Sequence, residues 1–469
     1  MRVLEVSAPL RPTSRRLRRI MLTLLALAGL SVAVGACESG NSSSSGSGTQ
    51  AASQAAEKAA VSGHVKGQLT VWVDAVRLPV AKAYAKAHPN VHVHIVTFDG
   101  DANGATTLQT KIQLWNRTGN GWPDVLFSEQ VNDPVWMAMK PFNFAEPLKG
   151  LIPQNLLSQW PAPSTAQCTV NGTQYCVQDN LAQDVLWVNK KLMDKFHYTV
   201  PATWQQWAAL GQQVATQHPG YIVGNIGDSF SHWIYLWGNQ CPLEQLQGPS
   251  RVLINATEAH CTQMASLLDP LIKNGTAPPL SVFTPDFAKK YGGANGKVLM
   301  MPGPSWFATA LFQQTLHIPA GQMTAAMPLR WGNDSTITTG QVGGGPWIIA
   351  SHSKNLAAAA NFVIWATTVF NPTGANARPG YPAYGPLAAK WLATLGQNPY
   401  FAASPAPALQ AAAPLIWKGW NLVTYPDQPV WSNTVVTGLV AGKSLSSLLQ
   451  PFGNALTQAA QAAGYQVVH

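Results

Sequence analysis

The side chains best suited to chemistry lie in one short segment, where an acid precedes several aromatic rings. Asp228 is followed by Phe230, Trp233 and Trp237. Aromatic rings can cover the apolar C–H face of a sugar while acids bind its hydroxyl groups, so this combination is typical of carbohydrate binding. The chain has 18 tryptophans among its 469 residues, so many such surfaces are available.

These acids do not form a recognisable catalytic arrangement. Glycoside hydrolysis needs two carboxylates about 5–10 Å apart, and no short segment presents such a pair among the 20 acidic residues. The sequence has no Gly-x-Ser-x-Gly, His-Glu-x-x-His or P-loop motif. The glycine run 343–345 predicts only a turn. We therefore expect no enzymatic activity, no cofactor and no metal site.

Composition excludes two further classes of protein. Only 10% of the residues are charged and 46% are hydrophobic, which argues against a disordered chain. The net charge is +9, but residues 1–36 hold six arginines and one glutamate, so the remaining 433 residues carry only +4. Nucleic-acid binding needs a clustered basic surface, and the sequence after residue 36 has no such cluster.

The N-terminus is typical of an exported protein. In residues 1–36, the basic stretch Arg15–Arg19 precedes the apolar run Ile20–Val34, which predicts a signal peptide. The run ends in Val34-Gly35-Ala36-Cys37, which resembles the lipobox of bacterial lipoproteins and implies lipid attachment at Cys37. Residues 37–64 are rich in Ser, Gly, Ala and Gln and predict a flexible tether. Either the general secretory or the twin-arginine route remains open.

The other cysteines predict disulfides. Four remain after Cys37, namely Cys168, Cys176, Cys241 and Cys261. An even number in an exported chain indicates two bonds, with three possible connectivities. Pairing neighbours in sequence, 168 with 176 and 241 with 261, needs the least special geometry. Their spacing does not match a zinc site.

Strand and helix patterns alternate in the body of the chain. Leu69–Val73 and Val91–Val96 are rich in β-branched residues, and the helical stretch Val80–His88 lies between them. A further helical pattern precedes the buried-type strand Val125–Phe127. This alternation predicts an α/β fold with a largely parallel sheet.

Several motifs, in order over about residues 65–460, resemble one family. The sequence is similar to the extracellular solute-binding proteins of ABC importers, in the sugar-binding branch that includes maltose-binding protein. The segments that carry the resemblance are Leu69–Trp72, Trp122–Phe127, Leu186–Leu192, Pro201–Trp204, Lys297–Trp306, Gly343–Gly345 with Lys354–Asn355, and Val440–Ser444.

The resemblance implies two α/β lobes, a hinge of crossing segments and a ligand cleft between the lobes. By analogy, residues 65–180 and 341–370 form the N-lobe, and residues 181–340 and 371–469 form the C-lobe. The ligand-binding residues that the resemblance implies are Asp74, Arg77, Ser128, Glu129, Asp179, Asn180, Asp184, Asp228, Phe230, Trp233, Trp306, Trp347 and Trp431. The tryptophans expected in packing positions are Trp72, Trp187, Trp204, Trp365 and Trp391.

The resemblance implies a monomeric lipoprotein on the outer face of the cytoplasmic membrane. It would capture a sugar or oligosaccharide and deliver it to the transmembrane subunits of an ABC permease. A polyol or polyamine ligand is an alternative within the same role. Outside that role, a surface glycan-processing enzyme is less favoured, and an adhesin is disfavoured because the sequence has no repeats.

Overall fold

The computed structural model describes residues 45–104, 106–332, 334–371, 378, 380–419 and 423–468. The predicted signal peptide and the lipid-attachment residue Cys37 lie outside this range. Within it, no helix combines the length and the apolar character needed to cross a membrane.

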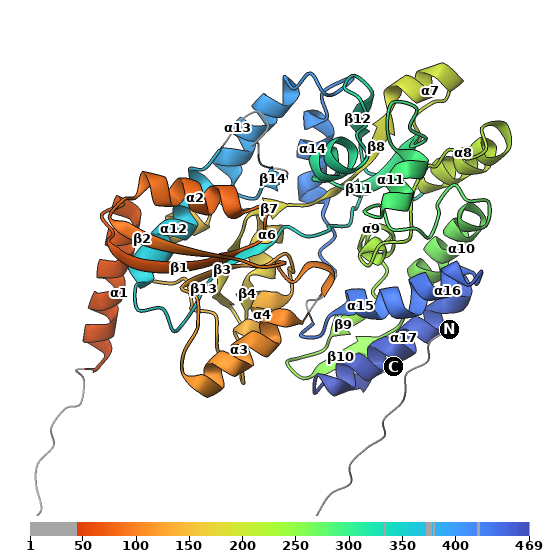
Figure 1. Cartoon of the computed structure of the whole chain (residues 1–469). Coiled ribbons are helices and arrows are strands. Elements are labelled where there is room, and N and C mark those ends of the chain that lie inside the picture. Colours follow the sequence, from red (N-terminus) through yellow and green to blue (C-terminus); the bar gives the residue numbers. More distant parts are fainter. Residues whose placement is uncertain are drawn as a thin grey trace, which may run out of the picture. The chain divides into compact units, whose positions relative to one another are not determined.

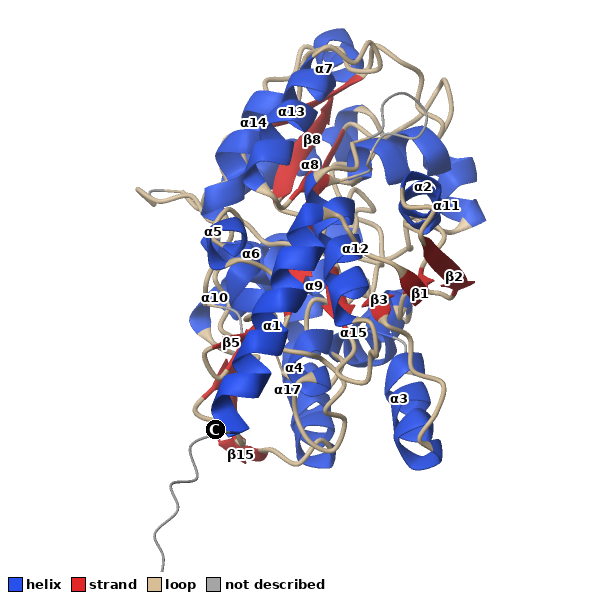
Figure 2. Cartoon of the chain, turned by 90° about the vertical axis from the view of Figure 1, so that its left-hand side faces the viewer, coloured by secondary structure: helices blue, strands red, loops and turns tan. Residues whose placement is uncertain are grey.

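A five-stranded sheet organises the first lobe, in the order β2-β1-β3-β13-β6 (Figure 1). Its strands are β1 (Gly67–Val73), β2 (Val91–Thr97), β3 (Val125–Phe127), β6 (Cys176–Gln178) and β13 (Pro346–Ile349). Strands β2 and β3 pair in parallel with β1, whereas β13 pairs antiparallel with both β3 and β6. Figure 2 shows β1, β2 and β3 side by side. The sheet therefore brings the carboxyl ends of β1, β3 and β6 to one edge.

Helices cover both faces of this sheet, as the alternation of side chains along its strands requires. Trp347 and Phe127 pack on one face, and Ile348 and Leu126 pack on the other. The helices of the first lobe are α1 (Ser45–Ser62), α2 (Leu78–Ala87), α3 (Thr107–Thr118), α4 (Asp133–Met137), α5 (Gln154–Leu157), α6 (Ala162–Gln167) and α12 (Leu356–Thr368). A small hairpin of β4 (Thr169–Val170) and β5 (Thr173–Gln174) precedes β6.

Two three-stranded sheets organise the second lobe. Strand β8 (Asp184–Asn189) lies between β11 (Met300–Pro304) and β12 (Met323–Ala326), so all six of its residues are buried. The other sheet consists of β9 (Glu244–Leu246), β10 (Arg251–Ile254) and β15 (Gln466–Val468). The helices around them are α7 (Lys190–Phe196), α8 (Trp204–Gln217), α9 (Ser231–Gly238), α10 (Ala259–Lys273), α11 (Pro285–Tyr291), α13 (Gly385–Gly396), α14 (Ala406–Ala412), α15 (Asp427–Trp431), α16 (Thr437–Val440) and α17 (Leu445–Ala462).

The α/β class predicted from the sequence is confirmed, and the predicted strands at 69–73 and 91–96 lie within β1 and β2. The prediction of a largely parallel sheet is wrong, because β13 comes from a distant part of the chain and pairs antiparallel with β3 and β6, and β8 pairs antiparallel with β11 and β12. Short segments pass between the lobes: β7 (Asn180–Leu181) leads from β6 to β8 and pairs with β14 (Tyr381–Pro382). The residue boundaries of the lobes remain a prediction.

The sequence predicts a flexible tether over residues 37–64, but most of this segment is helical in the structure. Residues 45–62 form helix α1, and Ala60 at its end is fully buried in the core. Alanine is the best helix former, and its small side chain allows two backbones to approach closely. The same alanine-rich composition, without an apolar stripe, is also typical of a linker, which is why the sequence predicts one. Only residues 37–44 of the tether lie outside the described range.

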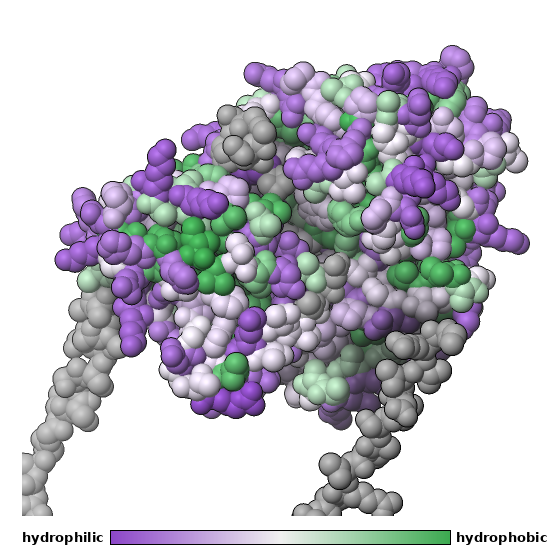
Figure 3. Space-filling view, viewed as in Figure 1, coloured by the Kyte–Doolittle hydropathy of each residue, from purple (hydrophilic) through white to green (hydrophobic). Residues whose placement is uncertain are grey.

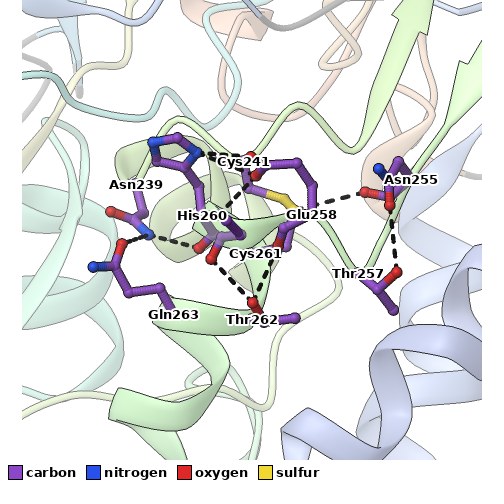
Figure 4. Close-up of a disulfide and its surroundings, with 10 residues drawn as sticks. Asn239, Cys241, Asn255, Thr257, Glu258, His260, Cys261, Thr262 and Gln263 are labelled. Carbon is purple, nitrogen blue, oxygen red and sulfur yellow. Dashed lines mark hydrogen bonds and ion pairs between the residues drawn. A yellow bond between two sulfur atoms is a disulfide. The ribbon is translucent and has the colours of Figure 1, made fainter.

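The two disulfides join Cys168 to Cys176 and Cys241 to Cys261, with Cα atoms 4.9 and 4.7 Å apart. These are the local pairs that the spacing favours. Figure 4 shows the second bond next to the start of α10, where Glu258 accepts a hydrogen bond from the backbone N–H of His260. The bond thus joins the end of α9 to the first turn of α10.

On the face seen in Figure 3, hydrophilic side chains cover most of the surface and apolar ones gather in a few groups. Among the larger apolar side chains exposed in the described residues, Phe283 is the aromatic one, and it is 44% exposed. Its neighbours make it relevant to the candidate site.

Asn361 on α12 joins three helices of the first lobe. Its amide donates to the carbonyl of Ala60 at 2.7 Å and accepts from the hydroxyl of Tyr84 at 2.6 Å. We predict that Asn361→Ala lowers the free energy of unfolding by about 1–3 kcal/mol, because it leaves buried polar groups unpaired. Urea denaturation checks this, with Asn454→Ala on the exposed face of α17 as the control. Equal effects of the two substitutions would contradict the prediction.

Candidate functional site

An ion network lies at the sheet edge where β1 and β6 end. Arg77 follows β1, and its Nη1 atom is 2.8 Å from Asp74 Oδ2 while its Nε atom is 3.6 Å from Asp179 Oδ2. Arg77 also covers the Phe127 ring, with its guanidinium carbon 4.1 Å from the ring centroid. Burial by itself lowers the pKa of Arg77, but the surrounding carboxylates raise it above its ordinary value. This arginine therefore stays charged inside the protein.

Asp179 is held by a second arginine and by a tryptophan. Arg378 forms an ion pair with Asp179 Oδ1, and the indole N–H of Trp347 donates to the same oxygen at 3.0 Å. Burial alone would raise the pKa of Asp179, but Arg378 and Arg77 lower it below its ordinary value. Trp347 is fully buried behind this carboxylate. The structure therefore places Trp347 as a support of Asp179, and not at a ligand-accessible surface as expected.

Three more predicted residues surround this network. Asn180 accepts a hydrogen bond from Arg77 Nη2 at 3.4 Å. Glu129 is half-buried, and burial raises its pKa to about 8 although Arg77 opposes that shift. Ser128 is fully buried and donates to Asp133 Oδ2 at 2.5 Å. Asp74, Arg77, Glu129 and Asn180 thus form one group, whereas Ser128 lies behind it.

In the second lobe, Asp228 precedes α9 and is buried. Its Oδ1 atom accepts from the hydroxyl of Ser281 at 2.7 Å and from the N–H of Val282 at 3.2 Å. Its Oδ2 atom has no hydrogen-bond partner. Burial raises the pKa of Asp228 to about 7. The carboxyl group therefore anchors a loop with one oxygen, and its other oxygen is buried without a partner.

The loop that contains Ser281 and Val282 continues to Phe283, whose ring packs against Trp306. The Phe283 ring lies nearly parallel to the Trp306 ring, with centroids 6.0 Å apart, and Phe230 meets Trp306 edge-on at 5.9 Å. Trp306 follows β11 and is half-buried, so part of its surface remains open. Phe230, Phe283 and Trp306 are called the aromatic trio below.

The lobe-crossing segment 342–345 connects the aromatic trio with the ion network. The indole N–H of Trp306 donates to the carbonyl of Val342 at 2.8 Å. Gly344 has a φ of +109°, and a Cβ atom there would lie 2.5 Å from the carbonyl oxygen of Asn180. Only glycine allows this close approach. Residues of both lobes thereby meet around this segment.

Trp233 and Trp431 lie away from that meeting point, in the core of the second lobe. The indole N–H of Trp233 donates to Asp427 Oδ2 at 2.7 Å, and His232 Nε2 lies 2.8 Å from the same oxygen. Trp431 is 0% exposed and stacks on His232. Both tryptophans are buried in this structure, so neither presents the exposed ring expected of a ligand contact. Trp187, Trp204 and Trp391 are buried, and Trp72 and Trp365 pack against the core, as the sequence predicts.

Asp184 begins β8 at the crossing between the lobes. It is buried, neither carboxylate oxygen has a hydrogen-bond partner, and burial raises its pKa well above the ordinary value. Burial without a partner favours the protonated form of such a group, because an unpaired charge would be costly there. Asp184 makes no contact with Arg77 in the ion pairs and hydrogen bonds of the described residues, so it does not join the group around that arginine.

The sequence analysis missed Phe283 and Arg378. Both lie in irregular segments, so periodicity carries no signal for them. Arg378 lies in a stretch that contains glycine and proline. Because only 10% of the chain is charged, an arginine at such a position could have indicated a buried carboxylate partner. The described residues contain no group of three or more His, Cys, Asp or Glu side chains that could hold a metal ion.

A half-open cavity of about 400 Å³ is lined by other residues of the described chain. Elements of both lobes line it, including α4, α6 and the segment 416–418. None of the predicted ligand-binding residues contributes to its lining.

The buried acids predict how stability depends on pH. The pKa of Asp228 is raised to about 7 from an ordinary value of 3.8, so the folded state binds more protons than the unfolded state between about pH 4 and 7. Stability should therefore fall as pH rises through that window, and Asp101, Glu129 and Glu244, with pKa values raised to about 8, extend the trend. We predict a lower thermal midpoint at pH 8 than at pH 5. Asp228→Asn should flatten the dependence between pH 4 and 7; an unchanged slope would contradict the assignment.

Comparisons with known proteins agree with this architecture. Residues 66–244 match the family model described as bacterial extracellular solute-binding protein. A search of curated proteins finds no match. Among solved structures, an ABC transporter-associated binding protein from B. animalis subsp. lactis Bl-04, in complex with β-1,6-galactobiose, has a TM-score of 0.68 at 15% identity, covering 86% of this chain and 100% of that one.

Two further structures show the same fold. The galacto-N-biose/lacto-N-biose I-binding protein of the ABC transporter from Bifidobacterium longum has a TM-score of 0.67 at 16% identity, covering 86% of this chain and 99% of that one. The GacH receptor of Streptomyces glaucescens GLA.O, studied unliganded and with acarbose, has a TM-score of 0.62 at 17% identity, with coverage of 86% and 100%. Over residues 66–244 this chain thus matches the bacterial extracellular solute-binding protein family, and its described residues have the two-lobed fold of ABC-importer binding proteins.

Proposed function

We propose that this protein captures a carbohydrate between its lobes and delivers it to the permease of an ABC importer. The proposal is supported by the crossing segment 342–345, which contacts Trp306 of the aromatic trio and Asn180 of the polar group formed with Asp74, Arg77 and Glu129. A pyranose presents apolar C–H faces and a rim of hydroxyls, and these two surfaces provide for both.

The protonation of the acids favours a neutral ligand. Asp228 and Glu129 have pKa values raised to about 7 and 8, so a large share of each is protonated near neutral pH and can donate as well as accept hydrogen bonds. Asp179 is ionised, but Arg77 and Arg378 already neutralise it. A polyamine would need several free carboxylates. This arrangement therefore supports a sugar over a polyamine.

The structural relatives support the same ligand class. The protein from B. animalis was solved with β-1,6-galactobiose and that from B. longum with lacto-N-biose. Both are described as belonging to ABC transporters. We infer that this chain likewise binds a sugar of two or more units and acts without catalysing a reaction on it.

We also propose that the protein is exported and attached by a lipid on Cys37. The lipobox-like sequence before Cys37 supports lipid attachment. The chain between Cys37 and α1 is only seven residues long, since α1 begins at Ser45. The folded body would then lie close to the membrane, within reach of a permease on the same surface.

Sugar binding is tested by thermal unfolding and tryptophan fluorescence of the purified protein with mono- and oligosaccharides, polyols and polyamines. One carbohydrate class should stabilise the protein by about 2.7 kcal/mol at a hundredfold excess over its Kd. Trp306→Ala should weaken that binding at least tenfold. The control is Trp122→Ala, because Trp122 precedes the amino end of β3 and the proposed site lies at the carboxyl end of the sheet. A response only to polyamines would refute the carbohydrate proposal, and hydrolysis of the added oligosaccharide would instead indicate an enzyme.

Phe283 provides a sharper test, because its exposed ring continues the surface of Trp306. We predict that Phe283→Ala weakens oligosaccharide binding about tenfold, or ~1.4 kcal/mol, whereas Phe283→Tyr retains it. Val440→Ala, at another exposed apolar residue, is the matched control. Equal affinities of the wild type and Phe283→Ala would exclude Phe283 from the ligand site.

Lipid attachment predicts a change of location. Cys37→Ser should release the protein from the membrane fraction without altering sugar affinity, because residue 37 lies before the folded body. Fractionation of expressing cells, followed by mass spectrometry of the N-terminal peptide, checks this. If the N-terminal peptide of the wild type carried no lipid on Cys37, the proposed anchor would be wrong.

A further inference from the structure

The 400 Å³ cavity has the size of a small-molecule site, and its lining contains none of the residues proposed to bind sugar. Its first-lobe lining comes from α4, α6 and the β4 strand with its turn. Its second-lobe lining comes from the end of β9 with the following turn and from Tyr465, and the segment 416–418 completes it. The cavity is therefore formed by both lobes.

The hydrogen-bonding groups of the lining are largely occupied by the protein. The amides of Gln167 and Gln341 bond to each other, and the hydroxyl of Thr169 donates to the carbonyl of Thr165 at 2.8 Å. The hydroxyl of Tyr465 accepts from the N–H of Thr424 at 3.3 Å. A sugar in this cavity would leave many of its own hydroxyls unpaired. The lining thus disfavours the ligand class proposed for the other site.

An apolar surface with one charge remains. Val135, Met139, Leu246 and Trp417 are half-buried and supply hydrophobic area from both lobes. Lys418 is the single charged residue of the lining; it is exposed and has no ion pair in the part of the chain described. No acid lines the cavity. Charge complementarity therefore favours an anion over an amine.

We propose that this cavity binds a small amphipathic anion, with an apolar body packed against Trp417 and Met139 and an anionic head next to Lys418. A free medium-chain carboxylate has this chemistry. Burial of its alkyl chain supplies most of the affinity, and the exposed lysine adds a smaller electrostatic contribution that salt reduces.

The test is isothermal titration calorimetry of the purified protein with decanoate, decanol and decyltrimethylammonium, each below its micelle concentration. Decanoate should bind one site more tightly than decanol, and the ammonium compound should bind more weakly than either. Lys418→Gln should weaken decanoate binding about three- to fivefold without affecting decanol. Lys443→Gln, at another exposed lysine, is its control.

Ala166→Phe provides the steric test, because Ala166 is an exposed residue of α6 on the cavity wall. The larger side chain should abolish decanoate binding, whereas Ala209→Phe on the exposed face of α8 should preserve it. An unchanged thermal midpoint confirms that each variant folds. Decanoate binding that survives Ala166→Phe, equal affinity for all three compounds, or no binding by the wild type would each overturn the proposal. None of these outcomes bears on sugar binding.

Discussion

Ion pairs between Asp179 and its two arginines hold the candidate site together. Asp179 lies where β6 ends, Arg77 follows β1, and Arg378 comes from the segment after α12. Trp347 on β13 donates to the same carboxylate, so one buried charge connects four segments. Removing one partner of a buried pair leaves an uncompensated charge and costs several kcal/mol. This network therefore holds the edge of the first sheet in one arrangement.

Asp184 and Asp228 are also buried acids, but unlike Asp179 they have no arginine partner in the described part of the chain. Asp184 has no hydrogen-bond partner at its carboxylate, and Asp228 has partners for only one of its oxygens. Burial raises the pKa of each, so their surroundings favour the protonated form where no ion pair is available. The same physics suits a neutral ligand, because a protonated carboxyl group can both donate to and accept from a hydroxyl. Burial thus raises the pKa of carboxyl groups both in the candidate site and in the core.

Several tryptophans in this chain donate their N–H groups to different acceptors, and they differ in burial. Those of Trp347 and Trp233 donate to buried aspartates and lie in the interior. Those of Trp187 and Trp207 donate to backbone carbonyls, and both side chains are fully buried as well. The N–H of Trp306 also donates to a backbone carbonyl, but its ring is only half-buried. The packing around the ring, and not the hydrogen bond, therefore decides which indole keeps an exposed surface.

Local patterns in the chain are enough to predict the elements formed by local interactions and the order of the motifs. The alternation in 69–73 and 91–96 predicts β1 and β2, the cysteine spacing favours the observed disulfides, and Asp74, Arg77 and Trp306 could be singled out as candidate site residues. Long-range packing alone settles which tryptophans are buried, that Phe283 reaches Trp306, and that Arg378 pairs with Asp179 across 199 positions. These contacts join residues in irregular segments far apart in the chain, and such residues carry no periodic signal. The end of helix α1 likewise depends on tertiary packing, because Ala60 is buried in the core and its carbonyl accepts a hydrogen bond from Asn361 on α12.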